Sequence, residues 1–134
     1  MRPEEANVLI IEDDANNVLV TTELLRMIGI KYFNARASGW QGLKLAESLA
    51  QIDLILLDIQ LPYEDGYQVL ERIRTSPKLK DTCVVAVTAN VLPQDEARAR
   101  AAGFNGMIGK PLDFDRFPQQ ILTLLRGEPI WRAR

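Results

Sequence analysis

The stretch LILLDIQLP, from Leu54 to Pro62, combines a run of aliphatic side chains with one aspartate. The aliphatic run does not alternate with polar residues, which predicts a strand buried on both faces, as in a parallel sheet. Asp58 ends that strand, where a charged carboxylate is costly unless another group uses it. The stretch therefore predicts a fold class and a position at which function is expected.

Strand and helix patterns alternate along the chain on both sides of this stretch. The expected strands are residues 7–11, 31–35, 53–58, 83–88 and 107–110, and the expected helices are 15–28, 39–49 after an N-cap at Ser38, 66–76, 93–102 and 114–125. This alternation predicts an α/β protein with a doubly wound, five-stranded parallel sheet and five helices. The strand order that we expect is the flavodoxin-like order 2-1-3-4-5.

Length and composition are those of one ordinary globular domain. We expect a domain at residues 1–126 and a C-terminal tail at 127–134, in a chain of 134 residues with 47% apolar and 25% charged residues. Tails usually fray, and the alternative for this one is a docking role for Trp131 and its flanking arginines.

The charge and the apolar runs limit the partners and the location that we expect. A net charge of −2 gives no electrostatic argument for binding nucleic acid or an anionic membrane. No apolar run approaches the length of a membrane span, and the N-terminus lacks the apolar core of a signal peptide, so we expect a cytoplasmic protein.

The sequence contains no histidine. This excludes histidine-based acid–base catalysis, histidine-ligated zinc and a Ser-His triad. If phosphoryl chemistry occurs here, a phosphohistidine donor must belong to another protein. Cys83 is the single cysteine, which excludes an internal disulfide, and we expect it to be a small apolar filler beside a strand.

Polar residues stand where the expected strands end. Glu12 and Asp13 follow the first strand, Asp58 ends the third, Thr88 the fourth and Lys110 the fifth. In a parallel sheet these ends share one edge, and ligands bind there at the topological switch point between strands one and three. Each residue taken alone is also compatible with a cap or a turn, but together they predict a site.

The chemistry open to such a cluster is narrow. Neighbouring carboxylates repel one another unless a cation neutralises them, and an oxygen-only ligand set suits Mg²⁺. A carboxylate beside the metal can accept a phosphoryl group as the nucleophile. Asp13 and Asp58 fit the metal, Asp58 the nucleophile, Lys110 the ammonium that pairs with phosphoryl oxygens, and Thr88 a supporting hydroxyl.

Four motifs carry a resemblance to a known family: VLIIEDDANN, LILLDIQLPYEDGYQVL, VVAVTAN and AAGFNGMIGKPL. In this order, over residues 8–125, they resemble the chemotaxis-regulator-like receiver domain of two-component response regulators. The stretch TANVLPQDEARARAAGFNGMIGKPL is especially similar to single-domain regulators and to receivers attached to hybrid histidine kinases.

The resemblance implies a phosphoacceptor signalling protein that is not an enzyme and assists only its own phosphorylation and dephosphorylation. Asp58 would accept a phosphoryl group from the phosphohistidine of a sensor histidine kinase or a histidine phosphotransfer protein. Asp13, Asp58 and the backbone carbonyl of Gln60 would hold Mg²⁺, and Glu12 would help through water. Gln60 would also influence dephosphorylation, together with Asn90.

The resemblance also implies a conformational output. Lys110 would pair with the phosphoryl group, and the bond between Lys110 and Pro111 would be cis. Thr88 would move toward a phosphoryl oxygen and remodel the surface of the fourth helix, fifth strand and fifth helix, where a downstream protein partner would bind. Many receivers carry a switching aromatic residue just before the last strand, and this sequence has Met107 there, a flexible gap-filling residue.

Several rival hypotheses remain at this point. A haloacid-dehalogenase-type phosphatase needs a second aspartate where this sequence has Gln60. A flavodoxin-like cofactor binder needs a phosphate-binding loop after the first strand, where this sequence has acidic residues. A receiver excised from a hybrid histidine kinase is a further alternative, although Met1 and the short tail favour a stand-alone chain. The last is a phosphorylation-independent interaction module.

Overall fold

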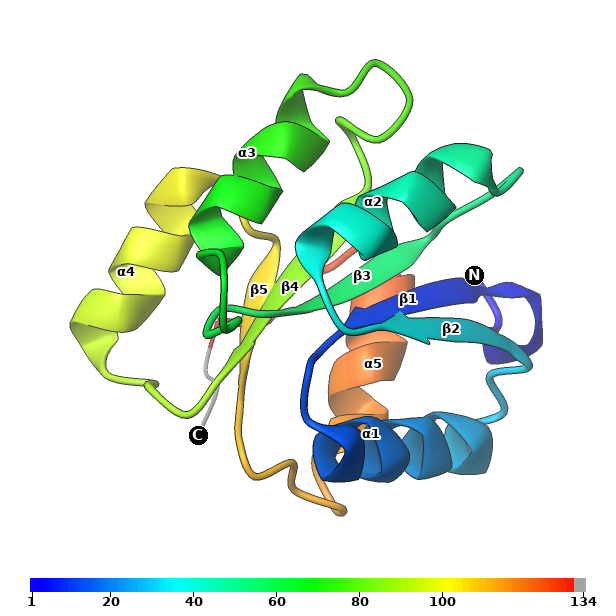
Figure 1. Cartoon of the computed structure of the whole chain (residues 1–134). Coiled ribbons are helices and arrows are strands. Elements are labelled where there is room, and N and C mark those ends of the chain that lie inside the picture. The colour runs from blue at the N-terminus through cyan, green and yellow to red at the C-terminus, as the bar shows by residue number, and fades with distance from the viewer. Residues whose placement is uncertain (132–134) are drawn as a thin grey trace.

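Five parallel strands form one sheet in the computed structural model, which describes residues 1–131 (Figure 1). The strands are β1 Asn7–Ile11, β2 Tyr32–Arg36, β3 Leu54–Asp58, β4 Cys83–Thr88 and β5 Gly106–Gly109. Their order is β2-β1-β3-β4-β5, which confirms the predicted fold class. All five residues of β3 are buried, because this strand is central and helices cover both faces of the sheet.

Helices cover the sheet in two layers. They are α1 Ala15–Ile28, α2 Gly39–Ser48, α3 Gly66–Thr75, α4 Pro93–Ala102 and α5 Phe117–Leu125, with a short 3₁₀ helix, η1, at Pro3–Glu5 that the sequence did not predict. Figure 1 shows α1 and α5 on one face and α2, α3 and α4 on the other. Each layer encloses its own apolar core against the sheet. Within residues 1–131, no helix is both long and apolar enough to cross a membrane.

Local signals set most helix ends as predicted. The Ser38 hydroxyl accepts from the backbone N–H of Gln41 and caps α2. Gly29 and Gly103 end α1 and α4 with φ values of 105° and 109°, which glycine adopts without strain. Cys83 begins β4 half-buried and packs against the core on the α1–α5 side, the filler role that the sequence predicted.

The last helix begins later than the sequence predicted. It starts at Phe117 rather than at residue 114, because Asp113 organises a turn before it: the Asp113 carboxylate accepts from the backbone N–H of Asp115 and Arg116. Phe114 therefore lies in this turn and is 65% exposed. The bounds of β2, β3 and β5 differ from the prediction by one residue, as is usual at strand ends.

The residues after α5 return to the sheet instead of fraying as far as the structure describes them. Gly127 turns the chain with a φ of 84°, and Ile130 then forms a parallel bridge to Gly106 at the outer edge of β5. Arg132 and Arg134, the arginines for which a docking role was an alternative, lie outside the described residues. The division into residues 1–126 and 127–134 stays a prediction.

Gly66, at the start of α3, is a position where the fold leaves no room for a side chain. A Cβ atom there would lie 2.6 Å from the backbone Cα of Ile59. We expect Gly66→Ala to lower the free energy of unfolding by about 2 kcal/mol, because the backbone after β3 has to shift. Urea denaturation checks this, with Glu71→Ala on the exposed face of α3 as the matched control. Equal stability of the two variants would contradict the crowding.

Candidate functional site

The register of the sheet brings two acidic residues side by side. Ile11 of β1 lies opposite Leu57 of β3, so the next residues, Glu12 just past β1 and Asp58 at the end of β3, lie beside each other. Both are buried, with 6% and 3% of their surface exposed. Their charges therefore need a partner at this edge.

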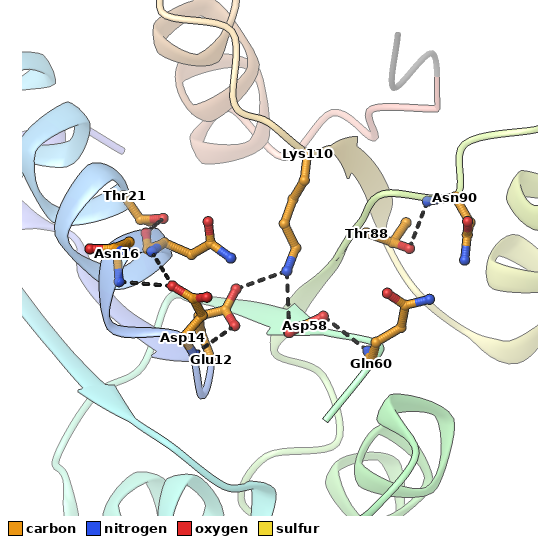
Figure 2. A network of polar contacts seen from close by, with 10 residues as sticks. Glu12, Asp14, Asn16, Thr21, Asp58, Gln60, Thr88, Asn90 and Lys110 are labelled. Atoms are coloured by element: carbon orange, nitrogen blue, oxygen red, sulfur yellow. Dashed lines mark hydrogen bonds and ion pairs between the residues drawn. The ribbon is translucent and has the colours of Figure 1, made fainter. Parts of the chain in front are cut away.

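Lys110 supplies that partner from the end of β5. Its Nζ donates to Glu12 Oε1 at 2.9 Å and pairs with Asp58 Oδ2 at 3.2 Å (Figure 2). The Lys110 side chain is itself only 17% exposed. One ammonium group thus offsets the repulsion between two buried carboxylates.

Burial and the charge cluster shift two pKa values at this edge. Burial raises the pKa of Glu12, since its ionised form loses solvation; the Lys110 ammonium opposes this rise and the Asp58 carboxylate adds to it. Burial alone would lower the pKa of Lys110, but its hydrogen bond to Glu12 and the two negative charges outweigh burial and raise it. Lys110 is therefore a permanent cation at neutral pH.

Thr88, Asn90 and Gln60 line the other side of Asp58 in Figure 2. The backbone N–H of Gln60 donates to Asp58 Oδ1 at 2.9 Å. Thr88 is buried, and its hydroxyl oxygen accepts from the backbone N–H of Asn90 at 3.1 Å. Asp58 is thus held by a cation on one oxygen and by an amide on the other.

The acidic residues fit a divalent cation. Glu12, Asp13 and Asp58 each offer a carboxylate oxygen, and the three oxygens lie within 4.8 Å of one another. Asp13 is exposed and the other two are buried, so the cluster opens to solvent beside Asp13. Three carboxylate oxygens with room for water are the ligands that Mg²⁺ prefers. The Gln60 backbone carbonyl stays a predicted ligand.

Asp14 is a supporting residue whose role the sequence did not reveal. It caps α1 through its carboxylate, which accepts from the backbone N–H of Asn16 and Asn17, and its own N–H donates to Glu12 Oε2 at 3.1 Å. The sequence also allows the acid pair Glu12 and Asp13 to cap this helix, but the N-cap is the next acid, Asp14. Its position directly before the helical pattern at 15–28 was the available signal.

Glu64 ties down the segment that follows Asp58. Its carboxylate accepts from the backbone N–H of Gly39 at the start of α2 and pairs with Arg72 of α3. Gln60 and Asp65 form an antiparallel bridge within the same segment. No local pattern predicts the Glu64 contact, because 25 residues separate its partners.

Two further predictions concern β5. The bond between Lys110 and Pro111 is cis, which confirms the expectation. Met107 lies within β5 opposite Ala86 and is fully buried in the core on the α2–α4 side. The methionine thus fills the interior three residues before Lys110.

Lys110→Ala removes the shared cation and tests this geometry. We expect the free energy of unfolding near neutral pH to fall by about 3 kcal/mol, because two buried carboxylates lose their partner. Burial already raises the pKa of Glu12, and without the opposing ammonium this pKa lies still further above its unfolded value, so stability is lost as the pH rises through the folded-state pKa of Glu12. The deficit should therefore shrink as the pH is lowered toward about 5.

The measurement is urea denaturation at several pH values, with Lys80→Ala at an exposed position as the control. A Lys110→Ala variant that is as stable as Lys80→Ala near neutral pH would contradict a shared cation. A deficit that does not change with pH would contradict the role of the carboxylates.

Comparison with known proteins places this geometry in one family. The chain matches the response regulator receiver domain over residues 8–122. It is 35% identical over 119 residues to the polar-differentiation response regulator DivK of Brucella ovis, which covers 89% of this chain and 95% of that protein. The DivK protein of Brucella anthropi is 34% identical over the same length.

Solved structures agree with this assignment. The receiver domain of the sensor histidine kinase PA1611 of Pseudomonas aeruginosa, determined with a magnesium ion coordinated in its active-site cleft, is 32% identical, with a TM-score of 0.78 over 92% of this chain and 98% of that one. A putative response regulator of Chloroflexus aurantiacus has a TM-score of 0.82 at 25% identity, over 90% and 98% of the two chains. This chain belongs to the response regulator receiver domain family of two-component signalling.

Proposed function

We propose that this receiver accepts a phosphoryl group on Asp58 from the phosphohistidine of a sensor histidine kinase or a histidine phosphotransfer protein. The observation that carries the proposal is the Lys110 ammonium, held between Glu12 and Asp58 at the carboxyl edge of the sheet. A cation at this position can pair with the oxygens of an incoming phosphoryl group as well as with the acceptor.

The transfer exchanges one bond to phosphorus for another. A carboxylate oxygen of Asp58 bonds to phosphorus while the bond from phosphorus to the partner's histidine nitrogen breaks, and that nitrogen leaves with the electron pair. Lys110 offsets charge on the phosphoryl oxygens, and the Thr88 hydroxyl donates to one of them. The product is an aspartyl phosphate.

Mg²⁺ is the cofactor that the acidic residues fit. Glu12, through water, with Asp13, Asp58 and the backbone carbonyl of Gln60 would hold it. When bound, it supplies positive charge that offsets the charge on the phosphoryl oxygens. Asp13 is the exposed member of the cluster, so its replacement disturbs the buried charges least.

The donor would approach over α1 and the turn before α5. A hollow of about 180 Å³ beside Lys110 is lined by residues that include Glu12, Asn17 and Phe114. Leu19 of α1 and Phe114 of the turn are 58% and 65% exposed. Exposed apolar side chains on α1 and at the rim of a hollow beside Lys110 suit docking of the partner that carries the phosphohistidine.

The output is a contact with another protein and not the turnover of a substrate. Thr88 ends β4 and Lys110 directly follows β5, so a phosphoryl group held by both acts on the α4–β5–α5 surface, formed by α4, β5 and α5. Phosphorylation adds charge and strong acceptors at that point. We therefore place the downstream partner on this surface.

Asp58→Asn tests the acceptor. Incubated with Mg²⁺ and acetyl phosphate, the wild type should gain the mass of one phosphoryl group, and Asp58→Asn should gain none, because an amide is not a nucleophile for this reaction. The matched variant Asp13→Asn keeps the acceptor and should need a higher Mg²⁺ concentration for the same gain. Intact-mass spectrometry measures all three proteins.

Two results would contradict the proposal. One is equal phosphorylation of the wild type and the Asp58→Asn variant. The other is a wild type that neither gains mass from acetyl phosphate nor binds beryllofluoride with Mg²⁺, which would leave a phosphorylation-independent interaction module.

A further inference from the structure

The residues after α5 occupy the outer edge of β5. β5 is the last strand in the sheet order, so the backbone groups on its outer side are open to pairing. Ile130 forms a parallel bridge with Gly106 there, and the N–H of Met107 donates to the Ile130 carbonyl at 2.8 Å. The edge of the sheet is thus paired by the chain itself.

Gly106 is fitted to this close approach. A Cβ atom at position 106 would lie 2.7 Å from the carbonyl oxygen of Ile130 and 3.2 Å from its nitrogen, and the three nearest atoms all belong to the Ile130 backbone. Any side chain at this position would therefore collide first with the returning segment. The contact depends on glycine here.

Ile130 and Trp131 anchor the segment on opposite faces of the sheet. Ile130 packs against the core on the α1–α5 side, and Trp131 packs against the core on the α2–α4 side. This alternation is that of an extended strand. The guanidinium of Arg100, on α4, lies 4.7 Å from the centre of the Trp131 ring, a cation–π contact.

α4 has few other attachments. Of its ten residues, all of them described by the structure, Ala99 alone is buried. Arg98 stacks on the Tyr67 ring at 4.0 Å, and Arg100 reaches the tryptophan of the returning segment. The segment therefore connects α4 to the edge of β5, within the α4–β5–α5 surface.

We propose that the outer edge of β5 and the adjoining side of α4 form a binding surface for an extended segment with an aliphatic residue followed by an aromatic one. Residues 128–131 of the same chain occupy this surface, and a protein partner that uses it must displace them. Displacement by a partner rests on the proposed function, which places a partner on the α4–β5–α5 surface. The occupancy of the surface by residues 128–131 does not rest on it.

Occupancy of the edge by residues 128–131 weakens the apparent affinity of a partner. A partner that pairs with β5 binds only the fraction of molecules whose edge is free, so its apparent dissociation constant is its intrinsic value divided by that fraction. The partner must present an extended backbone with a carbonyl that accepts from the N–H of Met107 and that fits against Gly106.

Gly106→Ala tests the occupancy in the full chain. With Trp40→Phe as background, Trp131 is the sole tryptophan. Gly106→Ala should lower the hydrogen-exchange protection factor of the Met107 amide by about fivefold or more, the loss of one hydrogen bond, and raise acrylamide quenching of Trp131. The amide of Leu56 in central β3 should keep its protection, which separates local release from global unfolding. Unchanged Met107 protection and unchanged quenching would overturn the occupancy.

A second variant tests whether the surface binds in trans. Ile130→Ser with Trp131→Ser, in the same background, removes both anchors and leaves Gly106 in place. The synthetic peptide GEPIWRAR should then shift the amide resonances of residues 106–108 and of Arg100, saturating in roughly the millimolar range, the effective concentration that a short tether supplies. Chains that keep Ile130 and Trp131 should need at least about tenfold more peptide, because they must first lose their own segment.

Two controls make the result decisive. Adding Gly106→Ala to the double variant should abolish the shifts, and a peptide of scrambled sequence should give none. The absence of saturable shifts up to about ten times the effective concentration of a short tether would overturn the binding surface. Asp58→Asn should leave every one of these results unchanged, so a failure of phosphoryl transfer is distinguishable from a failure of this proposal.

Discussion

The shared cation at the carboxyl edge of the sheet is the interaction on which the site depends. Parallel pairing of β1 with β3 leaves Glu12 and Asp58 side by side and nearly without solvent. Two carboxylates in that position repel each other and lose hydration, and Lys110 offsets both effects at once. Because one ammonium serves two acids, an added divalent cation or phosphoryl group changes the balance of charge for all three. The Lys110 ammonium thus stabilises the buried carboxylates, and the same pairing makes this edge of the sheet sensitive to any added charge.

Much of this arrangement could be predicted from the sequence, since parallel topology converts positions along the chain into positions in space. Once the alternation of strands and helices is recognised, the residues that end strands must meet at one edge. That argument predicts that Asp58, Thr88 and Lys110 meet at this edge, and the alternation itself predicts the fold class. The start of α5 does not, because a turn organised by the Asp113 carboxylate competes with the helical pattern that includes Phe114.

What the sequence could not supply are contacts between distant segments. The Glu64 carboxylate accepts from the N–H of Gly39, and Gly106 pairs with Ile130 in a parallel bridge. Neither pair belongs to a periodic pattern in the sequence. The role of Glu12 is another case. The family resemblance implied a ligand near a metal, but Glu12 also pairs with Lys110, which follows a strand that is not a neighbour of β1 in the sheet. The N–H of Asp14 holds the other carboxylate oxygen of Glu12. Periodicity predicts elements, whereas these contacts depend on how the elements pack.

β5 connects the chemistry to the interaction surface within four residues. Its carboxyl end leads into Lys110, whose backbone N–H donates to the Thr88 carbonyl at 2.8 Å, and its amino end pairs with Ile130. Where binding at one end of an element is coupled to binding at the other end, the coupling is reciprocal. If a phosphoryl group on Asp58 changes the occupancy of the β5 edge by some factor, release of residues 128–131 changes the phosphorylation equilibrium by the same factor. A partner that displaces the segment would then act on Asp58 without touching it, through the strand that joins the two ends.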